Sequence, residues 1–520
     1  MQDEKPDARN AGAPRQLPIS VLAALYPVAA LLPLVLAWGR PVAAMHPFEL
    51  AGAGLGLVAL AAMVVQFVTS GRFERVTGAL GIDRVMAFHK IAAWWVLLAL
   101  LLHPLAYVLP TFLEDPALGQ ERMVAYLTLP HYRSGVISLA ALALLVASSA
   151  LRERLPWRYE VWRASHVLLA VIALAGGLHH AVTAGRFSVA GPVHAYWWAI
   201  GALGVAAIGT LYGWRWLGLH RQPWRLARVT RLADRLWELD VQPEPGTAPL
   251  RYDAGQFAWI TVGGRRFPLF DHPFSIADSP KRPGLSFIIK EAGDFTRTVG
   301  ELPEGVAVGI DGPYGDFTLQ SHRGDGVLLL AGGAGIGPIM GLLRDLAARG
   351  DPRPVRLAYA AGRPENLGCL DEIEGARSGL DLDVLLLSEE DGPGWRGEVG
   401  RIDRERLAQM LSGLDPARCT AMICGPGGMI TAISEILLDL GGGALQLVDG
   451  GVHPAEGIGR VGPEVVRAGP LGDGLEGPLV QAVAADRQQP AEAPGLPRAD
   501  PDGVDPDVQG GSGIGCLEGR

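Results

Sequence analysis

The sequence predicts a multi-domain membrane protein: a six-helix transmembrane bundle, then an antiparallel β-barrel domain, an α/β Rossmann-like domain and a disordered C-terminal tail. Long uncharged runs are confined to residues 17–220, short alternating runs begin at Arg225, and strand and helix patterns alternate after Gly326. With 520 residues, 49% of them hydrophobic, and a mean hydropathy of +0.22, the chain is too long for one domain and too apolar to be wholly soluble.

Six stretches approach the roughly 20 apolar residues that a helix needs to cross about 30 Å of hydrocarbon. They are residues 17–37, 49–70, 87–109, 134–151, 163–184 and 193–217. Arginines gather after the second, fourth and sixth stretches, and short loops that carry positive charge stay cytoplasmic. We therefore expect both termini and the soluble half in the cytoplasm. The four cysteines follow the membrane region without metal-binding spacing, which fits reduced thiols in that compartment.

Two of these stretches carry histidines at a matched spacing. His89 and His103 lie fourteen residues apart, and so do His166 and His180, with His179 beside the latter. At about 1.5 Å and 100° per residue, this spacing separates two levels by roughly 21 Å on nearly the same helix face. The third and fifth helices run in the same direction, so His89 is level with His166, and His103 with His179 or His180. An ideal helix favours His180; a bulge would admit His179.

Ionisable groups inside a membrane are costly, and neutral imidazole is a common axial haem ligand. The pattern therefore predicts two stacked haems held by His89, His103, His166 and His179 or His180. The alternative is that these histidines only form hydrogen bonds between helices, as happens in membrane bundles. Two pairs at matched spacing favour haem.

A glycine-rich turn directly follows the strand Val327–Leu330 and directly precedes a helix. Its key residues are Gly332, Gly333, Gly335, Gly337 and Pro338. Glycines let a backbone approach a pyrophosphate, and the helix N-terminus offers free N–H groups to it. The turn indicates a dinucleotide site; the alternative is a simple tight turn.

Further motifs occur in a fixed order along the soluble half. They are His272-Pro273-Phe274-Ser275, Gly293-Asp294-Phe295-Thr296, Gly312-Pro313-Tyr314-Gly315, the glycine turn and Cys424-Gly425-Pro426. In this order and spacing they resemble the ferredoxin–NADP reductase superfamily. With the histidine-bearing membrane domain in front, the chain resembles ferric reductases and NADPH oxidases, bacterial members most closely, over about residues 17–440.

The resemblance implies FAD, NADPH or NADH, and two haem b groups as cofactors. The implied flavin-binding residues are His272, Pro273, Phe274, Ser275, Lys290, Gly293, Asp294 and Thr296. The Ser275 hydroxyl would lie near the reactive ring nitrogen, to which it can donate a hydrogen bond, and Gly293 and Thr296 would hold the pyrophosphate. Taken alone, Ser275 is better interpreted as a hydroxyl that caps a turn at a strand end.

The resemblance likewise implies a nicotinamide site at Cys424, Gly425 and Pro426, with the Cys424 side chain packed beside the transferring hydride. Taken alone, Cys424 is an ordinary buried thiol. Arg363 falls where relatives place a cation for the adenosine phosphate, which suggests NADPH over NADH. An arginine after a strand is otherwise a solvated surface charge.

The C-terminal end departs from the family pattern. Relatives end with a strand that carries aromatic residues near the flavin, whereas this chain holds no aromatic residue after Trp395 and is Gly-, Pro- and Ala-rich from Gly441 onward. Such a composition is too poor in large apolar groups to fold alone. We therefore expect no final strand, a divergent or frame-shifted tail and an incomplete flavin site. The expected parts are a tail at 1–16, a haem domain at 17–220, an FAD domain at 221–322, an NAD(P) domain at 323–440 and a tail at 441–520.

The expected function is that of a transmembrane oxidoreductase of the bacterial inner membrane. Electrons would pass from cytosolic NAD(P)H through FAD and two haems to an outside acceptor, a ferric chelate or molecular oxygen, with quinone or a periplasmic protein as further possibilities. Membrane lipid is the expected surrounding, a protein partner or oligomer stays open, and no nucleic acid is expected. The alternatives are a haem-binding membrane sensor or subunit with an inactive reductase half, and a tethered flavoreductase without haem.

Overall fold

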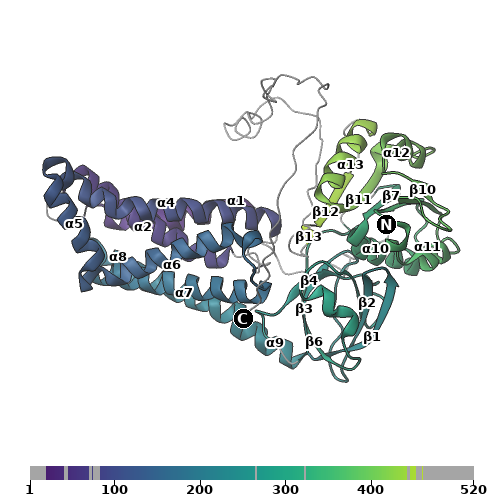
Figure 1. Ribbon diagram of the computed structural model, residues 1–520, viewed down its shortest axis with the longest axis horizontal. Coiled ribbons are helices and arrows are strands. Elements are labelled where there is room, and N and C mark those ends of the chain that lie inside the picture. The colour runs from purple at the N-terminus through teal and green to yellow at the C-terminus, as the bar shows by residue number, and fades with distance from the viewer. Residues whose placement is uncertain are drawn as a thin grey trace, which may run out of the picture. The chain divides into compact units, whose positions relative to one another are not determined.

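The computed structural model describes residues 19–39, 45–69, 73, 82–263, 266–320, 322, 324–441, 446–452 and 459–460. Within these ranges the N-terminal part is helical, the middle part is an antiparallel sheet and the last part is a parallel sheet flanked by helices (Figure 1). This sequence of parts confirms the coarse fold class that the residue patterns predict.

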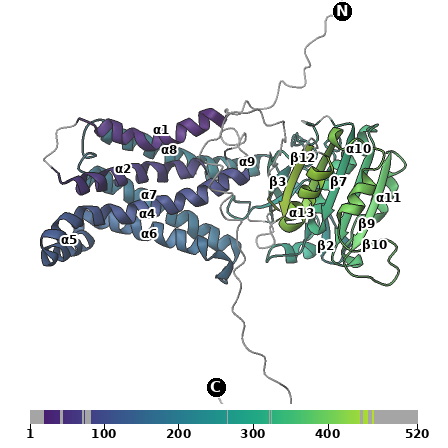
Figure 2. The same cartoon turned by 90° about the horizontal axis from the view of Figure 1, so that it is seen from above.

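The helices of the membrane part run alongside one another in both views (Figures 1 and 2). Their bounds are α1 Ile19–Ala37, α2 Pro47–Val68, α4 Ile82–Glu114, α6 Arg133–Ala150, α7 Tyr159–Ala184 and α8 Pro192–Ile208. Within the described ranges, five helical stretches are long and apolar enough to span a membrane: Pro47–Val68, Val85–Glu114, Pro130–Ala150, Tyr159–Ala184 and Pro192–Arg221. The first predicted span, 17–37, overlaps α1, in which the stretch Ala24–Ala37 is apolar but shorter than a span.

Two features of this part were not predicted. A further helix, α5, Pro116–Thr128, begins where Asp115 accepts hydrogen bonds from the backbone N–H groups of Ala117 and Leu118, because a carboxylate satisfies free donors at a helix start. The last span does not end at residue 217. It passes from α8 through a π-helical turn, Gly209–Trp214, into α9, Arg215–Arg221.

The middle part is a six-stranded antiparallel sheet of order β4-β3-β6-β1-β2-β5. Its strands are β1 Trp224–Ala233, β2 Leu236–Pro243, β3 Phe257–Val262, β4 His272–Ser275, β5 Leu285–Lys290 and β6 Ala307–Tyr314. Apolar residues such as Leu226, Leu239, Ile260 and Phe287 are fully buried in its core. The two edge strands of this sheet are β4 and β5. Among the described residues, one isolated β-bridge, from Ile276 after β4 to Phe287 of β5, connects these edges, so closure into a barrel stays a prediction.

The third part is a mainly parallel sheet of order β10-β9-β8-β7-β11-β12-β13. The strands are β7 Gly326–Gly332, β8 Val355–Ala361, β9 Leu382–Ser388, β10 Glu398–Val399, β11 Cys419–Pro426, β12 Gln446–Val452 and β13 Gly459–Arg460. The helices are α10 Ile336–Arg349, α11 Leu370–Ala376, α12 Arg404–Met410 and α13 Gly427–Leu440, and Figure 1 labels all four beside the sheet. Strand β7 is buried along its whole length, as expected for a central parallel strand.

The expectation that no strand follows residue 440 is wrong. Strand β12 pairs in parallel with β11, from Thr420 opposite Gln446 to Pro426 opposite Val452. Leu447 and Val448 of this strand are buried. A strand beside a central strand lies between two covered faces, so a short apolar run is enough to form it. Strand β12 carries no aromatic residue, and the domain boundary at 440 stays a prediction. The tail from 461 onward lies outside the described residues.

Candidate functional site

The structure brings the rings of His103 of α4 and His180 of α7 close together in the bundle. Their ring centroids lie 6.4 Å apart, and the ring planes are 87° apart. Two metal–nitrogen bonds of about 2 Å, each extended by about 1.1 Å to a ring centre, give a separation of roughly 6.2 Å for two imidazoles on one metal ion. The spacing of this pair therefore fits axial ligation of one iron.

Hydrogen bonds hold two of the candidate ligands by the ring nitrogen Nδ1. Nδ1 of His103 lies 2.7 Å from the carbonyl oxygen of Gly52, and Nδ1 of His166 lies 3.1 Å from the Ser149 hydroxyl oxygen. A ligating imidazole commonly donates its second N–H to such a group, which fixes the ring. In both residues this arrangement leaves Nε2 for a metal.

Two glycines make room for the candidate ligands His103 and His180. A Cβ atom at Gly56 of α2 would lie 2.7 Å from the His103 ring, and one at Gly135 of α6 would lie 2.9 Å from the His180 ring. Both distances are below any ordinary contact, so only glycine lets the neighbouring helix pass this close. The rings are thus seated by the packing of α2 against α4 and of α6 against α7.

The structure separates the two neighbouring histidines that the sequence left open. His180 faces His103, whereas His179 is exposed and its Nδ1 lies 3.1 Å from the Ser134 hydroxyl oxygen. At the other level, His89 and His166 are close enough to interact electrostatically. In the described ranges, no three His, Cys, Asp or Glu side chains gather as a metal site. Two imidazoles per metal suit haem, whose porphyrin supplies the other ligands.

Strand β4 carries the candidate flavin residues His272 to Ser275 and pairs with β3, with Ser275 opposite Phe257. The His272 ring stacks on Phe295, with centroids 4.2 Å apart and planes 4° apart, and its Nε2 lies 3.5 Å from a carboxylate oxygen of Glu160. Burial lowers the pKa of His272 below its ordinary value, and Glu160 opposes this shift. The imidazole is therefore neutral at pH 7.

The loop at residues 292–296 is held by its own threonine. The Thr296 hydroxyl accepts hydrogen bonds from the backbone N–H groups of Ala292 and Gly293, both 2.8 Å away. These bonds shape the loop that the resemblance assigns to the flavin pyrophosphate. They also occupy the N–H of Gly293, so this N–H is not available to a phosphate without rearrangement of the loop.

The glycine turn packs against the end of β11 and against β5. A Cβ atom at Gly335 would lie 2.1 Å from the carbonyl oxygen of Cys424, so the turn and the Cys-Gly-Pro motif are in direct contact. Gly333 has a φ of +52°, and its Cβ position is 3.7 Å from Nζ of Lys290. The predicted nicotinamide residues and Lys290 thus meet at the carboxyl ends of β7 and β11, where parallel sheets bind nucleotides.

Arg363 lies beyond β8, as predicted, but it has acidic neighbours. Its guanidinium is 3.2 Å from Glu390 and 3.9 Å from Glu365, and its side chain is 59% exposed. Exposed pairs of this kind contribute little to stability, so the side chain can leave them for another anion. The geometry therefore permits a phosphate ligand without requiring one.

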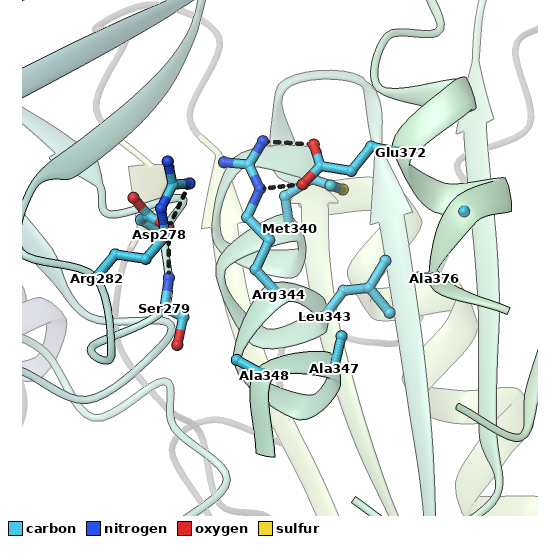
Figure 3. A pocket seen from close by; sticks show the side chains of 11 residues that line it. Asp278, Ser279, Arg282, Met340, Leu343, Arg344, Ala347, Ala348, Glu372 and Ala376 are labelled. Carbon is cyan, nitrogen blue, oxygen red and sulfur yellow. Dashed lines mark hydrogen bonds and ion pairs between the residues drawn. The ribbon is translucent and has the colours of Figure 1, made fainter. Parts of the chain in front are cut away.

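A cavity of about 420 Å³ lies at the other half of α10 from the glycine turn (Figure 3). Its lining includes Met340 and Arg344 of α10, Glu372 of α11, and Asp278 with Arg282 from the segment after β4. None of the predicted cofactor residues contributes to this lining. Arg344 was not among the predicted site residues. Its guanidinium donates hydrogen bonds to Glu238, to the Ala277 carbonyl oxygen and to Glu372.

A contact between α7 and the segment before β4 also escaped sequence analysis. Nη1 of Arg163 donates to Oδ1 of Asp271 at 2.5 Å and to the Asp271 carbonyl oxygen at 3.2 Å. The two side chains are 12% and 2% exposed. The available signal was weak: Arg163 stands three residues before His166, and Asp271 directly before His272.

Comparisons with known families match all three parts of the chain. A ferric reductase like transmembrane component matches residues 55–177, an FAD-binding domain matches 223–318, and an oxidoreductase NAD-binding domain matches 329–435. The chain therefore joins a ferric-reductase-like transmembrane part, an FAD-binding part and an NAD-binding part. This combination of domains is similar to that of ferric reductase and NADPH oxidase-like fusion proteins.

Individual relatives match the soluble half. The reductase component of propane 2-monooxygenase from Rhodococcus jostii is 30% identical over 226 residues, 41% of this chain and 58% of that protein. The flavohemoprotein of Bacillus subtilis is 24% identical over 44% of this chain and 57% of its own. The chain thus spans less than two thirds of these relatives. A ferredoxin NADP+ reductase from Neisseria gonorrhoeae, solved with bound FAD and NADP, is 19% identical, with a TM-score of 0.38, over 44% of this chain and 97% of that one.

Proposed function

We propose that the protein transfers electrons from NAD(P)H through FAD and two b-type haems to an acceptor on the far side of the membrane. The observation that carries the proposal is the 6.4 Å separation of the His103 and His180 rings inside a membrane helix bundle, within a chain that also holds flavin and nucleotide domains. Flavin, when bound, accepts hydride as two electrons and gives them up singly to haem iron.

Four histidines would hold the haems. His89 with His166 would hold the inner one, and His103 with His180 the outer one, which leaves His179 outside the ligand set. Bis-imidazole ligation leaves no open iron position, so the acceptor would receive electrons without binding to the metal. A ferric chelate and molecular oxygen are the candidate acceptors.

The soluble half would arrange the two reacting rings. Ser275 ends strand β4, where its hydroxyl can donate a hydrogen bond to a flavin ring nitrogen. Cys424 lies at the carboxyl end of β11 against the glycine turn, where its small polarizable side chain can pack beside the nicotinamide. Lys290 is near enough to the turn to neutralise a pyrophosphate. Arg363 would select NADPH by its charge after giving up Glu390.

We place the protein in the inner membrane of a bacterium with both termini and the soluble half in the cytoplasm. The support is the gathering of arginines in one set of loops, including Arg152, Arg154 and Arg158 before α7. Six membrane spans, with α1 as the first, would place the termini on one side.

The test is anaerobic addition of NADPH to the purified protein in detergent. We expect a bis-imidazole haem spectrum whose bands shift to the ferrous form, followed by reoxidation when oxygen or ferric citrate is added. Material that lacks a Soret band would overturn the proposal, and so would a haem content that stays unchanged when both His103 and His180 are replaced by Ala. His179→Ala is the matched control and should keep both haems.

A further inference from the structure

The cytoplasmic end of α7 contacts the strand that carries the candidate flavin residues. Arg163 pairs with Asp271, and Glu160, one helical turn earlier, lies 3.5 Å from Nε2 of His272. These four side chains, which we name the α7–β4 contact, are between 2% and 14% exposed. Burying a charged group costs free energy unless an oppositely charged partner is close to it. The α7–β4 contact is therefore expected to keep the geometry in which its charges are paired.

The same helix carries the candidate inner-haem ligand. Residue 163 precedes His166 by three positions, or about 4.5 Å along the helix axis. A row of rings leads from β4 to this ligand: His272 to Tyr159 at 5.9 Å, Tyr159 to Trp162 at 5.8 Å, and Trp162 to His166 at 5.5 Å between centroids. The contact therefore lies between the strand that carries the candidate flavin residues and the candidate haem ligand His166.

Arg163 also packs on the flavin domain through its planar face. Its guanidinium carbon lies 5.4 Å from the Trp259 ring centre on β3 and 6.0 Å from the Tyr159 ring centre. A guanidinium can stack on aromatic rings and donate to a carboxylate at the same time, which a lysine cannot do as well. The arginine thus joins α7 to strand β3 and to the segment directly before β4.

We propose that the α7–β4 contact, with Arg163 and Asp271 as its positioning residues, sets the distance and orientation at which the flavin passes electrons to the inner haem. The inference rests on the proposed function and adds the surface that determines one of its rates. Each transfer moves one electron, oxidising the flavin by one electron and reducing one ferric iron to ferrous, and no covalent bond changes.

Two single variants, Arg163→Gln and Asp271→Asn, remove the pair, and the exchange Arg163→Asp with Asp271→Arg restores it in reverse. Anaerobic stopped-flow measurement would follow haem reduction after NADPH, and a soluble dye would measure electrons taken directly from the flavin. We expect haem reduction to slow at least tenfold in each single variant, dye reduction to stay within twofold, and the exchange to recover part of the loss. The control exchange, Arg228→Asp with Asp240→Arg on β1 and β2, should change neither rate.

Hydrogen–deuterium exchange gives a second readout that does not depend on turnover. Peptides that cover residues 157–166 and 266–276 should lose protection in Asp271→Asn relative to the wild-type protein. Asp271 lies outside the membrane helices, so Asp271→Asn should keep its haem. This variant therefore still tests the contact if Arg163→Gln loses its haem. Unchanged haem reduction in Asp271→Asn would overturn the inference alone, whether or not the exchange of these peptides changes. Absence of NADPH-dependent haem reduction in the wild type would overturn the proposed function instead.

Discussion

Arg344 of α10 offers the sharpest test of how the soluble half holds together. Its Nη1 donates to Glu238 at 2.8 Å, to the Ala277 carbonyl at 2.6 Å and to the Ser286 hydroxyl at 2.8 Å, while Nε and Nη2 donate to both oxygens of Glu372. One guanidinium thus joins the flavin sheet to two helices of the nucleotide domain. Figure 3 shows its pair with Glu372. Its side chain is only 10% exposed.

The perturbation is Arg344→Met, which keeps the apolar stem and removes every donor. Glu238, 12% exposed, would be left without its cation, and breaking a buried pair in this way costs about 3 to 5 kcal/mol. Glu372 is 48% exposed, so the loss of that pair adds at most about 1 kcal/mol. For a module of roughly 200 residues, 3 to 5 kcal/mol corresponds to a Tm lower by about 6 to 20 °C.

The assay is thermal unfolding of the detergent-solubilised chain, followed by a thiol-reactive fluorophore. Cys369, Cys419 and Cys424 are buried in the nucleotide domain, so their reaction reports the unfolding of that domain. Arg344→Met with Glu238→Gln should regain part of the loss, because the orphaned charge is gone. Arg228→Met, which breaks an exposed pair with Asp240, is the control. A Tm within about 2 °C of wild type for Arg344→Met would refute the reasoning.

Further predictions concern single sites. His180→Ala should lose about half of the haem in a pyridine haemochrome assay and His179→Ala none; equal losses would contradict the assignment. Gly56→Ala should lower haem content, since its Cβ would lie 2.7 Å from the His103 ring. The pKa of His272 is lower in the folded than in the unfolded protein, so protonation of this residue favours unfolding. The free energy of unfolding should therefore decrease as the pH is lowered below about 6.5, and His272→Gln should remove this dependence. Arg363→Ala should raise KM for NADPH several-fold and leave KM for NADH unchanged; a parallel rise would exclude 2′-phosphate selection.

The histidine pattern could be predicted because a membrane fixes the local structure. A span of hydrocarbon forces the chain into a helix, so a fourteen-residue spacing translates directly into depth and face. The choice between His179 and His180 needed only an ideal helix, and the structure places His180 opposite His103. The order of the motifs in the soluble half likewise predicted a flavin-binding and a nucleotide-binding domain, and family comparisons match both.

Contacts between segments far apart in sequence could not be predicted. Arg163 and Asp271 are 108 residues apart, and nothing in either local pattern indicates the partner. Strand β12 was missed for a different reason: its composition resembles a linker, and only the covered face beside β11 makes a short run with Leu447 and Val448 into a strand. The roles of Gly56 and Gly135 depend on how closely two helices pack, which a single sequence does not encode locally.

Helix α7 connects the two halves of the proposed electron path. It carries Glu160 and Arg163 at its first turns, His166 one turn later and His180 near its other end, all on a continuous α-helix. Arg163 lies about one turn from His166 on this helix, so a shift at the α7–β4 contact would shift His166 and the group that it would hold. The outer level is about 21 Å further along the axis and is seated separately by Gly135 and by α4. Docking of the soluble half should therefore control the first electron transfer and leave the outer haem pair unchanged.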